Sequence, residues 1–169
     1  SMQSGCDSVL KRMNRKYDTA RFLQSVEALR AAFPGCAITT DMIVAFPGET
    51  DREFQESLAF IRKCGFAQMH IFPYSRRPGT VADRMPGQHS NAVKEARSRE
   101  AIAAAEEMNL AYRRSLIDSR QPVLFETEED GFWSGHAPNY VRVFARGTEL
   151  HNTIRNVRIT GLHGEGVEG

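Results

Sequence analysis

The run of eleven residues from Thr40 to Thr50 constrains the fold more than any other part of the chain. An apolar stretch rich in strand-forming residues ends abruptly at Pro47-Gly48, and Thr50 is followed three residues later by Glu53, which is the spacing of a capping box. We therefore expect a strand, a tight turn and a helix. Parallel α/β folds hold their ligands where strands end, so this turn is a candidate site. The alternative, that Pro47-Gly48 only turns the chain, is equally compatible with the spacing.

Hydrophobic periodicity predicts the other elements of the first part of the chain. Helices are expected over residues 7–14, 19–33, 51–64 and 91–118, and strands over residues 37–46 and 66–72. Helices that alternate with strands in this way are typical of βα units around a parallel sheet. Two strands are too few for a stable sheet of that kind, so we expect further strands upstream.

The pattern changes after Tyr74, where a polar, basic loop over residues 75–90 precedes the long fourth helix. Helical periodicity ends near Arg120, and short strands separated by turn signals are expected over residues 123–126, 132–135, 140–144 and 157–160. We therefore expect two domains, residues 1–120 and residues 121–169. The second is predicted to be a small β-barrel or sandwich.

Charge and cysteine usage limit the classes of protein to consider. The net charge of +1 is unevenly spread: residues 1–120 contain 18 Lys and Arg against 14 Asp and Glu, and residues 121–169 contain 4 against 7. Cys6, Cys36 and Cys64 form neither a disulfide framework nor a C-x-x-C metal motif, which indicates a reducing compartment. No apolar run reaches the roughly 20 residues of a membrane helix. We expect a cytoplasmic protein with no membrane contact and no metal ligands.

Few side chains indicate chemistry by their spacing alone. Basic residues near the start of the chain suit a carboxylate or phosphate but fit a solvated helix face equally well; they are Lys11, Arg12, Arg15 and Lys16. His70, near the end of an expected strand, is a candidate ligand or proton carrier, or a satisfied core or rim histidine. The Walker A, G-x-S-x-G and G-x-G-x-x-G motifs are absent. Spacing alone thus indicates part of an α/β enzyme with a β appendage.

Several longer motifs, in order, give the chain a specific resemblance. They are Gln3-Ser4-Gly5-Cys6-Asp7, the run from Val9 to Tyr17, the run from Thr40 to Thr50, and His70-Ile71-Phe72-Pro73-Tyr74-Ser75-Arg76-Arg77-Pro78-Gly79-Thr80. Together they resemble the radical S-adenosylmethionine methylthiotransferases. The F-P-Y-S-R-R-P-G-T and R-M-N-R-K-Y patterns look most like the branch that acts on tRNA carrying N6-threonylcarbamoyladenosine beside the anticodon.

This resemblance implies a fold and a cofactor set. The fold class expected is α/β: the C-terminal part of a radical S-adenosylmethionine partial βα (TIM-like) barrel, followed by a small all-β TRAM barrel that binds RNA. Full-length members hold [4Fe-4S] clusters and S-adenosylmethionine, which is cleaved to a radical that starts sulfur insertion, and a second S-adenosylmethionine donates the methyl group. The residues implied in cofactor binding are Gln3, Ser4, Arg15, Asp41, Ile43, Phe46, Phe72 and Tyr74.

Two departures from the family pattern matter. Ala45 stands where the family has glycine, which adds one methyl group on the cofactor side. The C-x-x-x-C-x-x-C cluster motif is absent, so this chain is not expected to ligate a cluster. We interpret the chain as the C-terminal part of a longer enzyme, inactive without its N-terminal part. The missing strands would leave an apolar sheet edge exposed, which favours a dimer.

The last part of the chain resembles a TRAM module at Asn139–Val143 and Asn156–Gly161. The residues implied in RNA binding are Tyr140, Arg142, Arg146, Arg155 and Arg158. Nearby aromatic residues such as Phe132 and Trp133 can either stack on RNA or fill the core. The leading hypothesis is therefore part of a tRNA methylthiotransferase. The alternatives are a stand-alone RNA-binding module, or a family member acting on a ribosomal protein or on isopentenyladenosine in tRNA.

Overall fold

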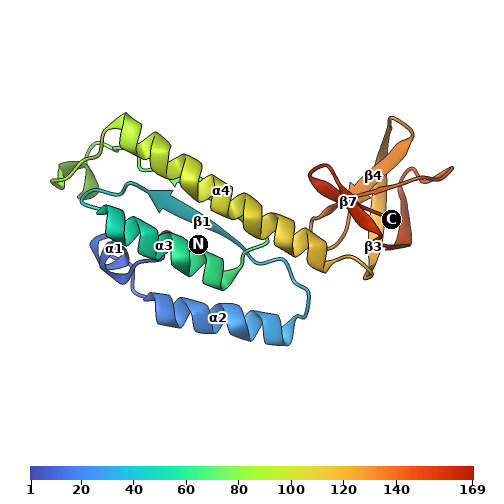
Figure 1. Cartoon of the computed structure of the whole chain (residues 1–169), viewed down its shortest axis with the longest axis horizontal. Coiled ribbons are helices and arrows are strands. Elements are labelled where there is room, and N and C mark those ends of the chain that lie inside the picture. Colours follow the sequence, from blue (N-terminus) through green and yellow to red (C-terminus); the bar gives the residue numbers. More distant parts are fainter. The chain divides into compact units, whose positions relative to one another are not determined.

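The computed structural model describes all 169 residues, and the chain forms two compact units (Figure 1). The first unit comprises residues 1–34 and 38–109, and the second comprises residues 35–37 and 110–169. The division lies on the long helix α4 (Asn91–Ser115), whereas the sequence places the domain boundary after this helix, at residue 120.

The first unit contains the helices and strands that periodicity predicts, with ends that differ by a few residues. They are α1 (Asp7–Arg12), α2 (Thr19–Ala32), β1 (Thr39–Val44), α3 (Asp51–Cys64), β2 (Gln68–Pro73), the short 3-10 helix η1 (Ala82–Arg84) and most of α4. The loop over residues 75–90 is irregular except for η1. The alternation of helix and strand expected for a βα fold is therefore confirmed.

The two strands of the first unit pair in parallel, as predicted, with Thr39 opposite Gln68 and Val44 opposite Pro73. The chain start adds a short third segment to the sheet, because Gln3 bridges Met42 in parallel. The Gln3 N–H donates to the Asp41 carbonyl at 2.9 Å, and the Gln3 carbonyl accepts from the Ile43 N–H at 2.9 Å.

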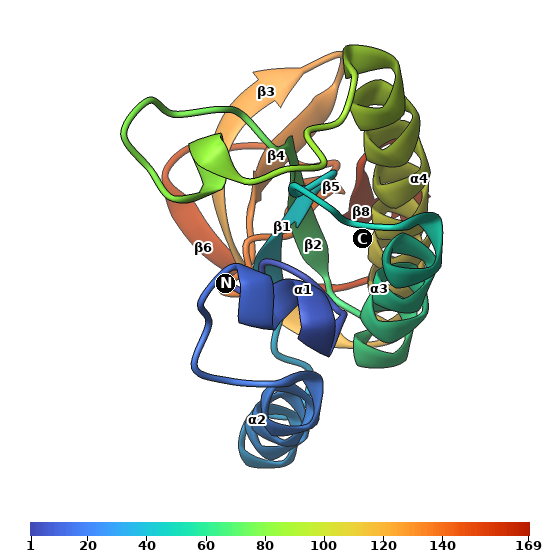
Figure 2. The same cartoon turned by 90° about the vertical axis from the view of Figure 1, so that its left-hand side faces the viewer.

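The two faces of this sheet have different surroundings. Met42 and Val44 are fully buried against side chains of α2, α3 and α4, including Val26, Phe54 and Ala101. Figure 2 shows α3 and α4 lying along the same side of β1 and β2. The alternate residues of the strands face away from this core and are partly or largely exposed; they are Asp41, Ile43, His70 and Phe72. We call this side of the sheet the open face.

Local chemistry sets the ends of α3 as the sequence predicts. The Thr50 hydroxyl accepts from the Glu53 N–H, and the Glu53 carboxylate accepts from the Thr50 N–H, which is a complete capping box. At the other end Gly65 adopts a left-handed conformation with φ of 62°, where a Cβ would be unfavourable. The helix therefore begins and ends where its own residues satisfy the backbone.

The second unit is a six-stranded sheet with the order β6-β3-β4-β5-β8-β7. Its strands are β3 (Arg120–Glu129), β4 (Phe132–His136), β5 (Arg142–Ala145), β6 (Thr153–Arg158), β7 (Gly161–His163) and β8 (Gly166–Glu168). Asp130 and Gly131 both have positive φ, 51° and 76°, which is the conformation that a tight β3–β4 hairpin needs. Strands β7 and β8 are additional to the strands expected from the sequence.

Removal of the Thr50 hydroxyl tests the capping box. We expect Thr50→Ala to lower the free energy of unfolding by about 1 kcal/mol, because the N–H groups at the start of α3 lose an acceptor. Urea denaturation followed by helical circular dichroism measures the change. Thr19→Ala is the matched control, since Thr19 begins α2 but its hydroxyl caps nothing. An equal loss in both variants would contradict the assignment.

Candidate functional site

The turn between β1 and α3 is held in an unusual backbone conformation. Ala45, fully buried, has φ of 58°, a left-handed value that favours glycine and costs a residue with a Cβ about 1 kcal/mol. Gly48, with φ of 73°, donates its N–H to the Gly87 carbonyl at 2.9 Å. A Cβ on Gly87 would lie 2.9 Å from the Gly48 Cα atom. The close approach of the two backbones therefore needs glycine at position 87.

A buried carboxylate holds this turn against α4. The Glu49 side chain is completely buried, and its Oε2 atom accepts from the Ala45 N–H at 2.7 Å and from Arg97 Nη1 at 2.9 Å. Arg97 Nη1 also donates to the Glu49 carbonyl, and Arg97 Nη2 donates to Asp51 at 2.7 Å. Burial raises the pKa of Glu49, and the Ala45 N–H and Arg97 oppose that rise.

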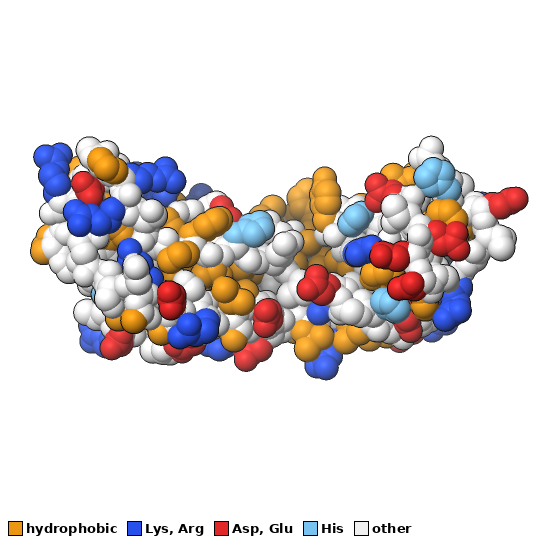
Figure 3. All heavy atoms as spheres, turned by 90° about the horizontal axis from the view of Figure 1, so that it is seen from above, with side chains coloured by type: hydrophobic (Ala, Val, Ile, Leu, Met, Phe, Trp, Pro, Cys, Tyr) orange, Lys and Arg blue, Asp and Glu red, His pale blue; other side chains and the backbone are white.

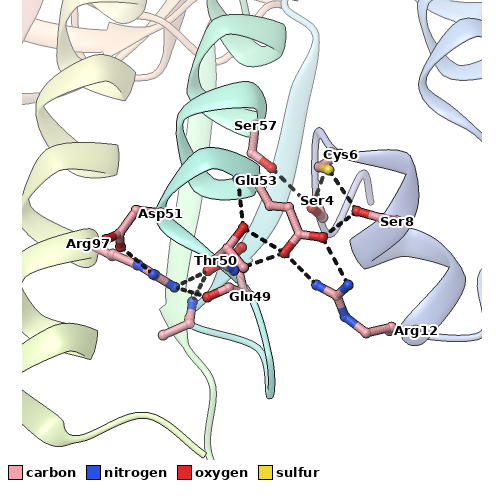
Figure 4. Close-up of polar contacts among 11 residues, drawn as sticks. Ser4, Cys6, Ser8, Arg12, Glu49, Thr50, Asp51, Glu53, Ser57 and Arg97 are labelled. Atoms are coloured by element: carbon pink, nitrogen blue, oxygen red, sulfur yellow. Dashed lines mark hydrogen bonds and ion pairs between the residues drawn. The ribbon is translucent and has the colours of Figure 1, made fainter. Parts of the chain in front are cut away.

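A second carboxylate holds α1 against α3. Glu53 accepts two hydrogen bonds from Arg12, at 2.9 Å and 2.8 Å, and another from the Ser8 hydroxyl. The Arg12 guanidinium is the main cause of a pKa of Glu53 well below the usual range for a carboxyl group. Figure 4 shows Arg97 of α4 and Arg12 of α1 reaching opposite sides of the start of α3. Arg12, one of the basic residues considered for an anion, therefore has an internal partner.

Gln3 and Ser4, two of the residues implied in cofactor binding, have different surroundings. Gln3 lies beside β1 in the backbone bridge described above, with φ of 68°. Ser4 is fully buried, with its Oγ atom 3.2 Å from Ser57 Oγ and accepting from the Cys6 N–H. A Cβ on Gly5 would lie 2.8 Å from the Ser57 carbonyl oxygen, so the chain start packs tightly on α3. Contact of Ser4 with a cofactor stays a prediction.

Phe46 and Tyr74 come together where β1 and β2 end. Their rings meet edge to face, with centroids 5.4 Å apart, and Phe46 is buried beside Cys6 and Val9. The Lys94 ammonium lies 5.7 Å from the centroid of the Tyr74 ring. The Tyr74 hydroxyl is buried and has no hydrogen-bond partner within the chain. Its hydrogen-bonding capacity is therefore open to water or to a ligand.

The open face brings together polar and apolar pairs from both strands. Asp41 is opposite His70 in register, with Oδ1 3.2 Å from the imidazole Nδ1, and Ile43 is opposite Phe72, whose side chain is half exposed. A hydrogen bond from the Ser1 hydroxyl is the main cause of a lowered pKa of Asp41, and His70 adds to it. His70 is thus an exposed histidine with a carboxylate partner.

The sequence did not reveal the pairing of Asp41 with His70, because register between strands far apart in the chain cannot be read from spacing. One signal was available in the sequence. Asp41 is two residues before Ile43 and His70 is two residues before Phe72, so each lies on the same face of its strand as a residue implied in cofactor binding. Arg15, by contrast, is exposed beyond the end of α1 and its side chain forms no hydrogen bond or ion pair.

Basic residues lie at one end of the first unit. Lys and Arg side chains gather at the left of Figure 3, over the part that includes the loop 75–90. Arg76 in this loop is bonded to Asp83 at 2.8 Å, whereas Arg77 and Arg84 are exposed. This surface is suited to a polyanion.

No group of three or more His, Cys, Asp or Glu side chains in the chain could hold a metal ion. Cys6 and Cys64 are buried, and burial raises the pKa of the Cys64 thiol to about 11. The chain also has no helix with the length and apolar character needed to cross a membrane.

The residues expected to contact RNA lie in the second unit. Tyr140, with φ of 62°, is 87% exposed in the loop before β5. Arg142 begins β5 and Arg146 follows that strand, and both lie over phenyl rings. On β6, Arg155 is exposed and Arg158 forms an ion pair with Asp118 at 2.8 Å. These five side chains therefore do not share one environment.

Comparison with known proteins gives consistent matches. The Radical SAM superfamily model matches residues 1–61. Threonylcarbamoyladenosine tRNA methylthiotransferase MtaB of Bacillus subtilis is 42% identical over 153 residues, 88% of this chain and 34% of that protein. The Thermotoga maritima protein of the same name is 42% identical over 168 residues, 99% of this chain and 38% of that protein.

A second kind of relative also matches. The tRNA-2-methylthio-N(6)-dimethylallyladenosine synthase of Nocardia farcinica is 47% identical over 123 residues, 73% of this chain and 24% of that protein. The chain thus spans between 24% and 38% of the length of these three relatives.

Removal of one partner of the buried ion pair tests its weight in the fold. We expect Arg97→Met to lower the free energy of unfolding by roughly 3 kcal/mol, because the Glu49 carboxylate stays buried without its cation. Arg99→Met, at an exposed position of the same helix, is the control and should change it by less than about 0.5 kcal/mol. Urea denaturation of both variants measures the difference. A small effect at Arg97 would show that the pair contributes little.

The pH dependence of stability tests the Arg12–Glu53 contact. A carboxyl whose folded pKa is lowered stabilises the fold above its unfolded pKa, and this contribution is lost as the pH falls. We therefore expect Glu53→Gln to be less stable than the original chain at neutral pH, and the gap to narrow between about pH 5 and about pH 3. The raised pKa of Glu49 acts in the opposite direction; burial is its main cause and the Glu53 charge a lesser one, so most of it is common to both proteins.

Urea denaturation at a series of pH values measures this gap. Glu56→Gln, on the exposed side of α3, should run parallel to the original chain. A gap for Glu53→Gln that stays constant with pH would mean that Arg12 does not stabilise the ionised carboxylate.

Proposed function

This chain belongs to the radical S-adenosylmethionine methylthiotransferases, and we propose that the protein of which it is part adds a methylthio group to N6-threonylcarbamoyladenosine beside the anticodon of tRNA. The observation that carries the proposal is the 42% identity to two proteins named for that reaction, over 88% and 99% of this chain. The match to a dimethylallyladenosine synthase covers 73% of the chain.

We propose that the open face forms part of the S-adenosylmethionine site. Ile43 and Phe72 offer adjacent apolar side chains on which an adenine ring can lie, and the partnerless Tyr74 hydroxyl supports a polar ligand nearby. Asp41, held by His70, would orient hydroxyl or amino groups of the cofactor, and Gln3, whose backbone groups are both bonded to β1, would contact it through its side chain. S-adenosylmethionine bound there would supply the radical that starts the reaction, with the electron coming from a [4Fe-4S] cluster, and a second S-adenosylmethionine would supply the methyl group.

The residues of this chain do not fit an iron–sulfur cluster, because no three side chains of the ligating types come together. We therefore assign the [4Fe-4S] clusters to the part of the protein beyond this sequence, and propose that this chain alone is inactive. The unpaired edge of the β1–β2 sheet is where that part, or a second copy of the chain, would dock.

We propose that the second unit serves as an RNA-binding module of the TRAM type. Exposed Tyr140 and the arginines of β5 and β6 support this role, because aromatic rings and guanidinium groups are the side chains that stack on bases and bind phosphates. The residues proposed for this contact are Tyr140, Arg142, Arg146, Arg155 and Arg158.

A second substrate has a specific observation in its favour. The Nocardia farcinica relative, named for dimethylallyladenosine, has a higher identity of 47%, although over a shorter segment. The two substrates differ in the group on the adenine nitrogen: threonylcarbamoyl is polar and anionic, and dimethylallyl is apolar. The longer coverage of the two threonylcarbamoyladenosine enzymes, 88% and 99% of this chain against 73%, favours the first substrate.

Nucleoside mass spectrometry of tRNA from a deletion strain tests the proposal. We expect the methylthio form of threonylcarbamoyladenosine to disappear, the unmodified form to accumulate, and the dimethylallyladenosine nucleosides to stay unchanged. Complementation with the full-length gene should restore the mark. Loss of methylthio-dimethylallyladenosine would instead establish the second substrate, and no change in either nucleoside would refute the proposed function.

A further inference from the structure

Five side chains of the second unit form a cluster of alternating aromatic and cationic groups. The His163 ring, at the end of β7, lies 4.8 Å from the Phe132 ring of β4 and 4.4 Å from the Phe144 ring of β5, between centroids. The Arg146 guanidinium lies 4.4 Å from the centroid of Phe132, and the Arg142 guanidinium lies 4.8 Å from that of Phe144. We call these five residues the arginine–aromatic cluster. Strands β4 and β7, which contribute to it, are labelled in Figure 1.

The cluster concentrates positive charge in an otherwise acidic part of the chain. Residues 121–169 contain no lysine and only four arginines, against seven acidic residues. Arg158 is bound to Asp118, whereas neither Arg142 nor Arg146 has a carboxylate partner. Arg142 donates one hydrogen bond to the Ser134 hydroxyl at 3.1 Å. Two exposed cations therefore lie together with their charges uncompensated by direct contact.

Of the acidic groups beside the cluster, Glu129 lies opposite Phe132 in the β3–β4 register, and Glu168 is bonded within the cluster. Glu168 Oε2 lies 3.0 Å from His163 Nδ1, and this contact fixes the plane of the imidazole ring between the two phenyl rings. Phe132, Phe144 and His163 are each only partly exposed, so the rings act as a support under the guanidinium groups. A guanidinium that already lies over a ring loses less conformational freedom when it binds a ligand.

A planar guanidinium held over a ring can bind two parts of a nucleotide. Its N–H donors suit the oxygens of a phosphate, and its exposed plane suits a stacked base. Two such groups on one surface match a flexible strand with repeated phosphates, and stacking tolerates any base. An acidic peptide offers carboxylates for the same donors but no ring to stack on the guanidinium plane.

We infer that the arginine–aromatic cluster is a binding site for single-stranded RNA, with Arg142 and Arg146 each contacting a phosphate and a base. The inference rests on the RNA-binding role proposed above. It replaces the five separate candidate residues for RNA contact with one surface. Phe132, Phe144 and His163 become supporting residues of that surface, and Arg155 and Arg158 lie outside it.

Fluorescence anisotropy with the 169-residue chain and a labelled oligouridylate of about twelve nucleotides tests the inference. Arg142→Lys and Arg146→Lys keep the charge but lose the planar group, and we expect each to weaken binding about tenfold. Arg120→Lys, at an exposed position of β3 that belongs neither to the cluster nor to the proposed RNA contact, is the matched control and should bind within about twofold of the original chain. Thermal unfolding of each variant checks that the fold is kept.

The salt dependence supplies a second, independent readout. Each phosphate contact on a single strand contributes about 0.7 to the slope of log affinity against log salt concentration. The double variant Arg142→Ala, Arg146→Ala should therefore reduce the slope by about 1.4, and the double lysine variant should keep it. Phe144→Leu should weaken binding about fivefold with the slope unchanged, since it removes the support but no cation.

Three outcomes would overturn the inference. Lysine variants that bind like the original chain would show that charge alone is enough, and a loss at Arg120 as large as that at Arg142 would place the RNA elsewhere on the second unit. A chain that binds polyglutamate as tightly as oligouridylate would show no preference for nucleic acid. None of these results bears on the methylthio modification of tRNA, because the deletion strain tests that proposed function separately.

Discussion

The buried ion pair of Glu49 and Arg97 is the contact on which the geometry of the strand ends depends. Glu49 has no exposed surface, and one of its oxygens holds both the Ala45 N–H and the Arg97 guanidinium. The pair therefore connects Ala45, the left-handed residue after β1, to Arg97 in the first third of α4. Desolvation of the two charges offsets much of their attraction, so the pair specifies a conformation more than it adds stability. That conformation is the one that brings Phe46 beside Tyr74.

A second carboxylate, four residues further along the chain, fixes the start of α3 against α1. Glu53 completes the capping box of α3 and binds Arg12 of α1, so one side chain sets both a helix start and a tertiary contact. The pKa directions of the two carboxyls differ because their surroundings differ: Glu49 is desolvated, whereas Glu53 is dominated by its cation and hydrogen bonds. The start of α3 is thus clamped between α1 and α4, and the turn that precedes it has little freedom (Figure 4).

The structural features that the sequence predicts correctly are those determined by residues close together along the chain. The capping box of Thr50 and Glu53 and the bounds of α3 at residues 51–64 both follow from local backbone chemistry. Strands β7 and β8 were missed because three residues are too few to show alternation, and they form only where β5 offers an edge. The Glu49–Arg97 and Asp41–His70 contacts join residues far apart in sequence, which no periodicity reports.

The open face of the β1–β2 sheet supports the proposal that this chain is part of a larger protein. Parallel sheets are normally covered on both faces, because their crossover helices lie on one side and a barrel interior or further helices lie on the other. Here Met42 and Val44 are buried on one side, while Ile43 and Phe72 stay accessible on the other. Leaving Phe72 half exposed loses part of the roughly 1.5–3 kcal/mol that full burial of such a side chain would contribute.

The same face also carries the hydrogen-bonded pair of Asp41 and His70, so it is not a simple docking surface for another apolar layer. Burying that pair without further polar partners would cost more free energy than the apolar contact contributes. The arrangement is instead suited to a ligand with both a flat apolar part and polar groups, as in the S-adenosylmethionine site proposed above.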